Sequence, residues 1–404
     1  MTNRASILTS ILILIFALPP AFGATAEESK VYTPYFNMTL SEAMFVPSKG
    51  DFFSGGNMDT QVGMLAKFDP INSLFGLYNF KYAGPAFQPQ DGKQFQERSL
   101  SHGFNFEYRR SFRDSWRVRP GIAYTKEYRR TGANEAWANG LYNMNSLGGQ
   151  LALDYEFDWR DKKGMLTLQY LMRGIAFPNY TDLLREFQQA GAASELSGGL
   201  QDQTLHQISL RPAWNNFFGG FSYSWQSYKN ERVIEASGVY GDTAQKDTNT
   251  TLDFGLHHTL WVFEMAPNIA WTMHRSNQNF LRFKYFGDTT PAFIAKNYDY
   301  NQLDLTVPLD LLITKKWAVS GAIQLTKRDY TDRAARDSEN NYNSNKQSNL
   351  LTSISGGIRK RLNDVAMVRL NYTFVVGKSN NHFERYLPYN YTGQHVGIAY
   401  QLSY

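Results

Sequence analysis

The sequence predicts an all-β chain, folded as a closed antiparallel up-and-down barrel of about 16 strands. Three observations predict this fold: long runs of alternating apolar and polar residues, short polar turns that alternate with long polar loops, and tryptophans gathered beside the short turns. The 404 residues are 42% hydrophobic and 19% charged, a composition typical of a folded protein. The mean hydropathy of -0.45 excludes a bundle of membrane helices, because each such helix needs about 20 apolar residues.

The alternating runs are the primary evidence for strands. Apolar residues occupy every second position at 116–124, 147–157, 350–358 and 366–374. A period of two over this length describes a strand with two different faces. Strands of a soluble β-sandwich are about five or six residues long, so these longer runs favour strands that cross a membrane. An open sheet edge cannot be satisfied in lipid, and we therefore expect the sheet to close.

Short turns and long loops set the expected topology. The long loops are rich in Gly, Asn, Asp, Ser and Lys and lie at 84–98, 129–144, 229–247 and 330–346. Tight periplasmic turns and long extracellular loops are the pattern of barrels that span the outer membrane. The short turns recur about every 50 residues, and we expect them at Asp69-Pro70, Arg113-Asp114, Arg160-Asp161, Asn215-Asn216, Glu264, Lys315-Lys316 and 361–364.

The number of strands follows from these turns. Seven short turns join fourteen strands, and the segment 393–404 adds one more. Chain ends on the same side of the membrane require an even number, so a first strand is expected near 31–41. The prediction is 16 strands, with 14 or 18 as alternatives because Pro34 interrupts the first strand.

Tryptophan placement supports the same topology. Five of the eight tryptophans lie within about three residues of an expected short turn, namely Trp116, Trp159, Trp214, Trp261 and Trp317. A belt of amphipathic rings at one membrane interface explains this placement. The alternative, aromatic residues that close a soluble β core, would not concentrate tryptophan at every second turn.

The first 26 residues differ from the rest of the chain. Arg4 supplies a positive start, 7–18 is an apolar core ended by two prolines, and 24–26 offers small residues for cleavage. This arrangement is typical of a Sec signal peptide rather than of a membrane anchor. We therefore expect residues 1–26 to be a signal peptide and residues 27–404 to form a single barrel domain.

The end of the chain carries the most specific motif. An apolar residue stands at every second position and an aromatic residue is last: Val396, Ile398, Tyr400, Leu402 and Tyr404. This pattern resembles the signal that the β-barrel assembly machinery of Gram-negative bacteria recognises in outer-membrane proteins, although that family most often ends in Phe. The resemblance implies an integral outer-membrane β-barrel, with the assembly machinery, outer-membrane lipids and lipopolysaccharide as partners.

Several kinds of chemistry are not indicated. Cysteine is absent, which excludes disulfides, thiol nucleophiles and thiolate metal sites. The seven histidines are scattered, and His257 and His258 point to opposite faces of one strand, so the pattern predicts no metal site. The net charge of +5 comes from 41 basic and 36 acidic residues spread along the chain, without a basic block that would bind nucleic acid. We expect no metal, no cofactor and no nucleic-acid partner.

Residues whose parity is opposite to that of the apolar face are predicted to line the lumen. Their charged side chains cannot face hydrocarbon cheaply, because a midplane Arg there costs about 2–4 kcal/mol. These residues either line a diffusion pathway or form an ion-paired network that fills the interior. The segment 176–200 is a candidate plug, or else an excursion on the surface. The predicted pore-lining residues are Glu107, Arg109, Arg117, Arg119, Asp154, Glu156, Arg211, Asp304, Arg359 and Arg369.

One short string resembles a catalytic motif. His274-Arg275-Ser276-Asn277 contains the H-x-S-N pattern of outer-membrane phospholipase A and of the lipid A deacylase. The resemblance implies His274 as base and Ser276 as nucleophile. Two observations count against it: Gln278 stands where a Gly commonly follows, and His274 has the parity of the lumen, whereas those enzymes present the pair toward lipid. Polar residues at the edge of a loop are the alternative.

The sequence thus predicts a porin-like channel for passive diffusion of small polar solutes, and not an enzyme. A plugged barrel that serves as a structural or interaction component of a surface or export system is the first alternative. An outer-membrane lipid hydrolase is the second. The sequence leaves the solute and the oligomeric state open.

Overall fold

A computed structural model describes residues 31–49, 53–84, 97–130, 136–181, 199–283, 290–384 and 389–404. The predicted signal peptide at 1–26 and most of the candidate plug at 176–200 lie outside these residues. Within the described ranges, no helix is long and apolar enough to cross a membrane.

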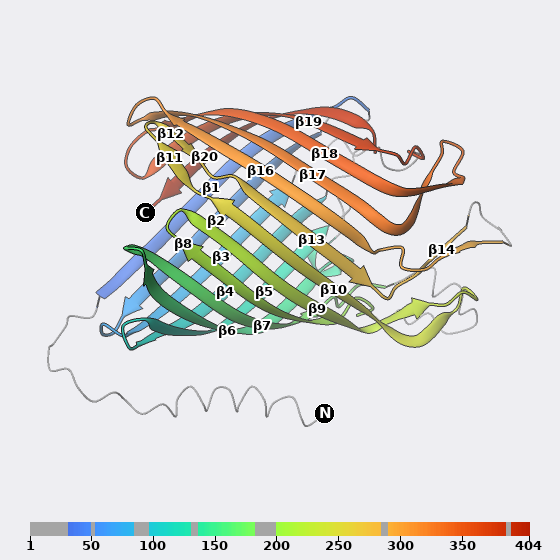
Figure 1. Cartoon of the computed structure of the whole chain (residues 1–404), viewed down its shortest axis with the longest axis horizontal. Coiled ribbons are helices and arrows are strands. Elements are labelled where there is room, and N and C mark those ends of the chain that lie inside the picture. The colour runs from blue at the N-terminus through green and yellow to red at the C-terminus, as the bar shows by residue number, and fades with distance from the viewer. Residues whose placement is uncertain are drawn as a thin grey trace, which may run out of the picture.

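The chain folds into one large antiparallel sheet that closes on itself (Figure 1). The 18 strands of this sheet form 16 membrane-crossing segments, because β11 continues β10 and β12 leads into β13. The strand number predicted from the turns is therefore confirmed. The strands are β1 (Val31–Pro47), β2 (Phe53–Lys67), β3 (Asn72–Gly84), β4 (Arg98–Phe112), β5 (Trp116–Arg130), β6 (Met144–Trp159), β7 (Lys162–Ala176), β8 (Gln203–Trp214), β9 (Phe217–Ile234), β10 (Tyr240–Leu256), β11 (His258–Leu260), β12 (Phe263–Met265), β13 (Asn268–Ser276), β16 (Tyr300–Leu312), β17 (Trp317–Arg336), β18 (Tyr342–Arg361), β19 (Ala366–Ser379) and β20 (Tyr391–Ser403).

Two small elements lie outside the barrel wall. The hairpin of β14 (Phe280–Arg282) and β15 (Ala292–Ile294) projects from the end of the barrel that carries the long loops (Figure 1). A single 3-10 turn, η1 (Trp137–Asn139), lies between β5 and β6. Both elements therefore belong to the extracellular side of the barrel.

The pairing of the first and last strands closes the barrel. β1 and β20 are in register from Asn37 opposite Ser403 to Pro47 opposite Gly393. Beyond β20, the backbone of Tyr404 exchanges two hydrogen bonds with Phe36, at 2.9 and 2.8 Å. The expected first strand near 31–41 is thus present and extends to Pro47. Pro34 is tolerated there because it precedes the part of β1 that pairs with β20, so its missing N–H removes no bond from the seam.

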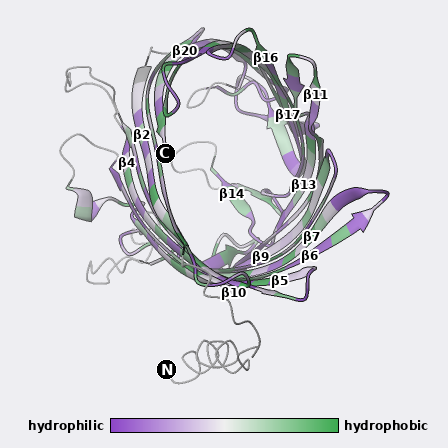
Figure 2. Ribbon diagram, turned by 90° about the vertical axis from the view of Figure 1, so that its left-hand side faces the viewer, coloured by the Kyte–Doolittle hydropathy of each residue, from purple (hydrophilic) through white to green (hydrophobic). Residues whose placement is uncertain are grey.

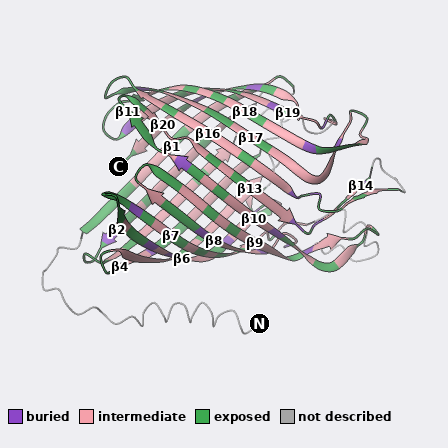
Figure 3. Ribbon diagram, in the orientation of Figure 1, coloured by how far each residue is buried: buried purple, intermediate pink, exposed green. Residues whose placement is uncertain are grey.

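The two faces of each strand differ as the alternation predicts. Large apolar side chains such as Phe106, Ile354 and Ile398 are more than half exposed. Hydrophobic and hydrophilic residues alternate along the strands, as do exposed and less exposed ones (Figures 2 and 3). In the described part of the chain the buried hydrophobic residues are all alanines, so no internal hydrophobic core holds the fold together. The apolar surface faces outward, where lipid replaces the core of a soluble protein.

Aromatic rings form a girdle at the short-turn end. Trp116, Trp159, Trp214 and Trp317 share the outward parity and lie beside short turns, and Trp261 lies within one. The rings of Trp159 and Trp214, on neighbouring hairpins, have centroids 4.6 Å apart. This confirms the predicted belt of tryptophans at one interface.

Four of the seven short turns contain left-handed residues. Arg160 and Asp161 have φ of 52° and 58°, and Asn215 has φ of 52°, so two residues suffice to connect the strands. One expected turn is displaced. Glu264 lies in β12 opposite Thr259, and the turn is at Trp261–Val262, because Trp261 takes φ of 56° and leaves Leu260 paired with Phe263.

Two of the expected long loops are strands instead. The segment 229–247 extends β9 and β10, and 330–346 extends β17 and β18, well beyond the rest of the barrel (Figure 1). Tight turns end both extensions, with Gly238 at φ 82° and Asn340 at φ 70°. Polar composition predicts a loop here, but a hairpin above the membrane can be polar on both faces.

An ion pair ties the loops on the two sides of the closure seam. Lys49 Nζ donates to Glu384 Oε2 at 2.6 Å, and Glu384 Oε1 accepts from the backbone N–H groups of Tyr389 and Asn390. The bond from Lys49 and, to a smaller extent, those from Asn390 and Tyr389 lower the pKa of Glu384 from 4.5 to about 2, against the opposing effect of desolvation. Because the folded pKa is depressed, the stabilisation from this contact is present above pH 4.5 and is lost as the pH falls toward 2.

Replacing Lys49 with Met should raise the pKa of Glu384 by about one unit or more, because the neighbouring cation is gone. Carboxyl-carbon NMR titration of the protein in detergent micelles measures this midpoint. Lys315→Met, at a short turn on the other side of the membrane, is the matched control and should leave it unchanged. A midpoint that stays near 2 in Lys49→Met would contradict the assignment of the shift to this pair.

Candidate functional site

Three neighbouring strands place a cluster of charged residues on the inner wall. Glu107 of β4, Arg117 and Arg119 of β5 and Asp154 of β6 occupy the parity opposite to the exposed apolar side chains. Two small residues lie among them. Gly121 is the register partner of Glu107, and Ala152, which is fully buried, is the partner of Arg119. These small residues leave room for long side chains to lie along the wall.

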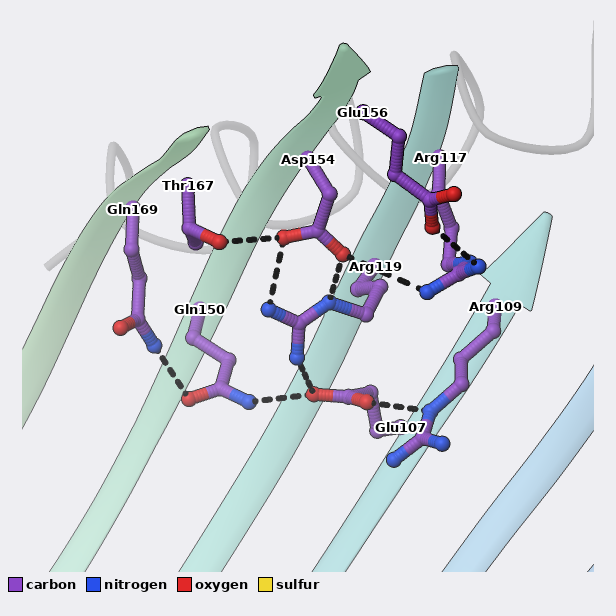
Figure 4. Close-up of polar contacts among 9 residues, drawn as sticks. All are labelled: Glu107, Arg109, Arg117, Arg119, Gln150, Asp154, Glu156, Thr167 and Gln169. Carbon is purple, nitrogen blue, oxygen red and sulfur yellow. Dashed lines mark hydrogen bonds and ion pairs between the residues drawn. The ribbon is translucent and has the colours of Figure 1, made fainter. Parts of the chain in front are cut away.

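Arg119 is the centre of this luminal network (Figure 4). Its Nε and Nη2 donate to the two carboxylate oxygens of Asp154 at 2.7 and 3.0 Å, and its Nη1 donates to Glu107 Oε2 at 3.1 Å. A bidentate contact of this kind combines charge with fixed geometry. One guanidinium therefore joins β4, β5 and β6.

Glu107 is the second hub of the network. Its Oε1 accepts from Arg109 Nε at 2.7 Å, and its Oε2 also accepts from Gln150 Nε2 at 3.2 Å. Gln150 in turn accepts from Gln169 Nε2 at 3.0 Å, which carries the chain of hydrogen bonds to β7. Every oxygen of the Glu107 carboxylate is thus engaged.

Asp154 is held from the opposite side. Thr167 Oγ1 on β7 donates to Asp154 Oδ1 at 2.8 Å, and Arg117 Nη1 lies 3.9 Å from Oδ2. Arg117 also donates through Nη2 to Glu156 Oε1 at 3.0 Å. The formal charges of the three arginines and three carboxylates of the network cancel.

Burial divides the network into two layers. Asp154 and Glu107 are only 2% and 6% exposed, so the two carboxylates lie against the wall. The side chains of Arg119, Arg109 and Arg117 are 24%, 35% and 38% exposed. The wall therefore shows guanidinium groups to the lumen in front of these two carboxylates, whereas the third carboxylate, Glu156, is 48% exposed beside Arg117.

The other predicted pore-lining residues share the inward parity but stand apart from this network. Arg211 is exposed beside Thr167. Asp304 accepts from Gln302 and Thr326, at 2.7 and 2.6 Å. Arg359 and Arg369 are register partners on β18 and β19, and within the described residues neither forms an ion pair.

The neutral members of the network were not predicted from the sequence; they are Gln150, Thr167 and Gln169. They share the inward parity of the charged residues, and that parity is the signal that could have found them. Only their cross-strand neighbours show that they act as bridges between charges.

The string that resembles a hydrolase motif does not assemble a nucleophile and base. His274 and Ser276 both have the inward parity, as expected. Ser276 Oγ accepts from the backbone N–H of Gln278 at 3.0 Å, whereas His274 Nδ1 is 2.8 Å from Asn249 Oδ1 and its ring stacks on Tyr300. Activation of a serine requires a hydrogen bond to its base, and the described contacts contain none between these two residues.

Metal and assembly motifs can also be placed. In the described part of the chain, no three His, Asp or Glu side chains are grouped so that they could hold a metal ion. The C-terminal motif residues Val396, Ile398, Tyr400 and Leu402 occupy the outward parity of β20, beside β1 and β19. Tyr404 is exposed at the short-turn end.

The closed sheet, its apolar outer surface and its aromatic girdle together decide the class of this protein. The chain is an outer-membrane β-barrel. No protein-family model matches its sequence, and no curated protein matches it.

Solved structures of other barrels resemble this one at low sequence identity. In-vitro folded OmpT, an outer membrane protein of Vibrio cholerae, is 12% identical with a TM-score of 0.46, covering 94% of this chain and 100% of that one. CdiB from Acinetobacter baumannii is 10% identical with a TM-score of 0.47, covering 93% and 65%. OccK1 of Pseudomonas aeruginosa is 8% identical with a TM-score of 0.43, covering 92% and 99%. The likeness is one of barrel architecture.

Replacing Arg119 with Met should lower the free energy of unfolding by about 2–3 kcal/mol, because Asp154 and Glu107 lose charged hydrogen bonds while they stay buried. Urea unfolding in phospholipid vesicles, followed by tryptophan fluorescence, measures the loss. Arg211→Met, which removes an exposed arginine from the same wall, should cost less than about 0.5 kcal/mol. Equal losses in the two variants would show that the network does not stabilise the wall.

Proposed function

We propose that this outer-membrane β-barrel is a water-filled, porin-like channel for the passive diffusion of small polar solutes across the outer membrane of a Gram-negative bacterium. The observation that carries the proposal is the exposure of residues on the inner wall. Met165, Phe218 and Leu351 have the inward parity and are exposed, at 37%, 37% and 40%. Side chains that filled the interior would bury such residues, because protein interiors are close-packed.

The course of the luminal side chains supports the same proposal. Arg119 and its partners form bonds between adjacent strands, so the network lies along the wall instead of crossing the lumen (Figure 4). A barrel of about 16 strands is wide enough to leave an aqueous passage once its walls are lined. An ion-paired wall and an open lumen are therefore compatible.

The distribution of charge gives the channel an expected preference. Arg359 and Arg369 lie on β18 and β19, about half-way round the sheet from the neutral network on β4–β7. Arg359 and Arg369 both lie close to the short turn that joins β18 to β19. We propose that this arginine pair sets a positive potential at the inner end of the pore, as fixed charges do in other channels.

A closed barrel that acts as a structural or interaction component is the second candidate, and the hairpin β14–β15 favours it. Arg282 Nη2 donates to Asn340 O and its guanidinium lies 4.4 Å from the Tyr342 ring, which ties the hairpin to β17–β18. Leu281 touches Gly238 at the tip of the β9–β10 extension. The hairpin therefore reaches across one side of the extracellular mouth.

Planar-bilayer recordings separate the two candidates. The purified, refolded protein should give stable stepwise conductance, and the double variant Arg359→Gln/Arg369→Gln should raise the cation-to-anion permeability ratio about twofold or more. Lys327→Gln, on the outer face of β17, is the control and should change neither property. A folded barrel that never conducts would favour the closed candidate. Unchanged selectivity would show that the arginine pair does not set the ion preference of the pore.

A further inference from the structure

A cavity of about 450 Å³ opens at the extracellular mouth, between the β9–β10 extension, the end of β13 and the hairpin β14–β15. It lies at the opposite end of the barrel from the luminal network, and its lining includes His274 and Ser276. Its size is within the range of sites for small molecules, about 300–1,000 Å³. Two carboxylates and four aromatic rings are the features of its lining that point to a ligand: Glu231, Asp247, Tyr240, Phe280, Phe283 and Tyr298.

Asp247 is the key group in this cavity. Its side chain has the inward parity and is only 7% exposed. Gln245 Nε2 donates to its two oxygens at 3.2 and 3.1 Å, but within the described residues Asp247 forms no ion pair. The Tyr228 side chain also hydrogen-bonds to Asp247. A buried carboxylate held only by a neutral amide and a phenol lacks the counter-charge that normally offsets its desolvation. Among the described residues that line the cavity there is no Lys or Arg.

The position of Asp247 is fixed by hydrogen bonds around Gln278. The Gln278 side chain is 6% exposed; its Oε1 accepts from Ile234 N at 3.0 Å, and its Nε2 donates to Arg232 O and to Gln245 Oε1. Gln245 in turn holds Asp247. The β9–β10 extension and the end of β13 are thereby braced against each other, which preorganises the cavity for a ligand.

Aromatic rings complete the site. Phe280 and Phe283 line the cavity and are exposed, 37% and 51%. Arg333 already lies over the Tyr298 ring at 5.8 Å, so we assign the two phenylalanine rings to the ligand. An ammonium group is attracted both to the faces of aromatic rings and to a carboxylate. A buried anion beside exposed rings therefore fits a small organic cation better than a sugar or an anion.

We propose that this cavity binds an organic ammonium ion, with its positive charge against Asp247 and its alkyl groups against Phe280 and Phe283. The inference deepens the proposed channel function. It rests on that function in one respect, because the channel is the route by which the bound solute leaves the mouth. Binding itself needs only the cavity, so the two proposals can fail separately.

Isothermal titration of the full chain in detergent micelles with choline chloride tests the proposal. Choline should bind saturably, and its neutral carbon isostere 3,3-dimethyl-1-butanol should bind at least about tenfold more weakly, because charge selects the ligand. Asp247→Asn should weaken choline binding about tenfold or more, and Phe280→Ala about threefold. Asp242→Asn removes an exposed carboxylate from the same hairpin and should change binding less than about twofold.

Heat-modifiable gel migration identifies the variants that fold, and Phe280→Ala keeps the test decisive if Asp247→Asn does not. The proposal is overturned if the folded protein takes up no choline, if the neutral isostere binds equally well, or if Asp242→Asn weakens binding as much as Asp247→Asn. Conductance without choline binding would overturn the proposed ammonium site and leave the proposed channel function standing. Choline binding by a barrel that never conducts would overturn the proposed channel function and leave the ammonium site standing.

Discussion

The lack of water in the bilayer core is the constraint on which this structure depends. Each backbone N–H and C=O within the membrane needs a partner in the sheet, and an open sheet would leave two edges without one. The ladder between β1 and β20 removes both edges, and the bonds between Phe36 and Tyr404 extend it to the short-turn end. Closure also divides every strand into an outer and an inner face. The positions of the charged groups on the barrel wall follow from that division.

On the inner face, charge is organised by burial. The carboxylates of Glu107 and Asp154 lie against the wall, and arginines cover them toward the lumen. Small residues make this packing possible, since a Cβ on Gly121 would lie 3.0 Å from the side chain of Gln150. A charge that is paired and hydrogen-bonded in this way can be buried at a tolerable cost.

The lumen carries fixed charges at both of its ends. A pair of arginines lies near the short turns, on β18 and β19, whereas Asp247 lies beneath the extracellular mouth without a basic partner among the described residues. At the short-turn end, Glu264 and Asp310 share the inward parity with the arginines, so charges of both signs are present there. In our account, the mouth selects the solute and the inner end sets the ionic preference of the passage.

The sequence predicts most of the fold because period-two alternation reports the two faces of a strand directly. Even the first strand, with Pro34 in it, could be predicted from the parity of the strand count. The turn at Trp261 could not, because a left-handed tryptophan has no compositional signal. The strand extensions at 229–247 and 330–346 were expected as loops, since a polar hairpin above the membrane lacks the apolar face on which the prediction rests.

The candidate sites show a similar limit. Inward parity identifies the charged residues of the wall, but it does not show that Arg119 joins Glu107 and Asp154 while Arg211 stays apart. The cavity at the mouth was not predicted, because it brings together segments between 201 and 298 whose contacts depend on tertiary structure. Periodicity gives the face of a residue and not its neighbours.

The most direct test of a two-faced barrel around a wet lumen uses the absence of cysteine from the chain. Single cysteines at Ser353, Ile354, Ser355 and Gly356 of β18, with the protein in vesicles, can be treated with a membrane-impermeant maleimide. The account predicts that the inward positions 353 and 355 react and that the lipid-facing positions 354 and 356 do not. Equal reaction at all four positions would contradict the two faces. Protection of 353 and 355 would contradict a lumen that is open to water.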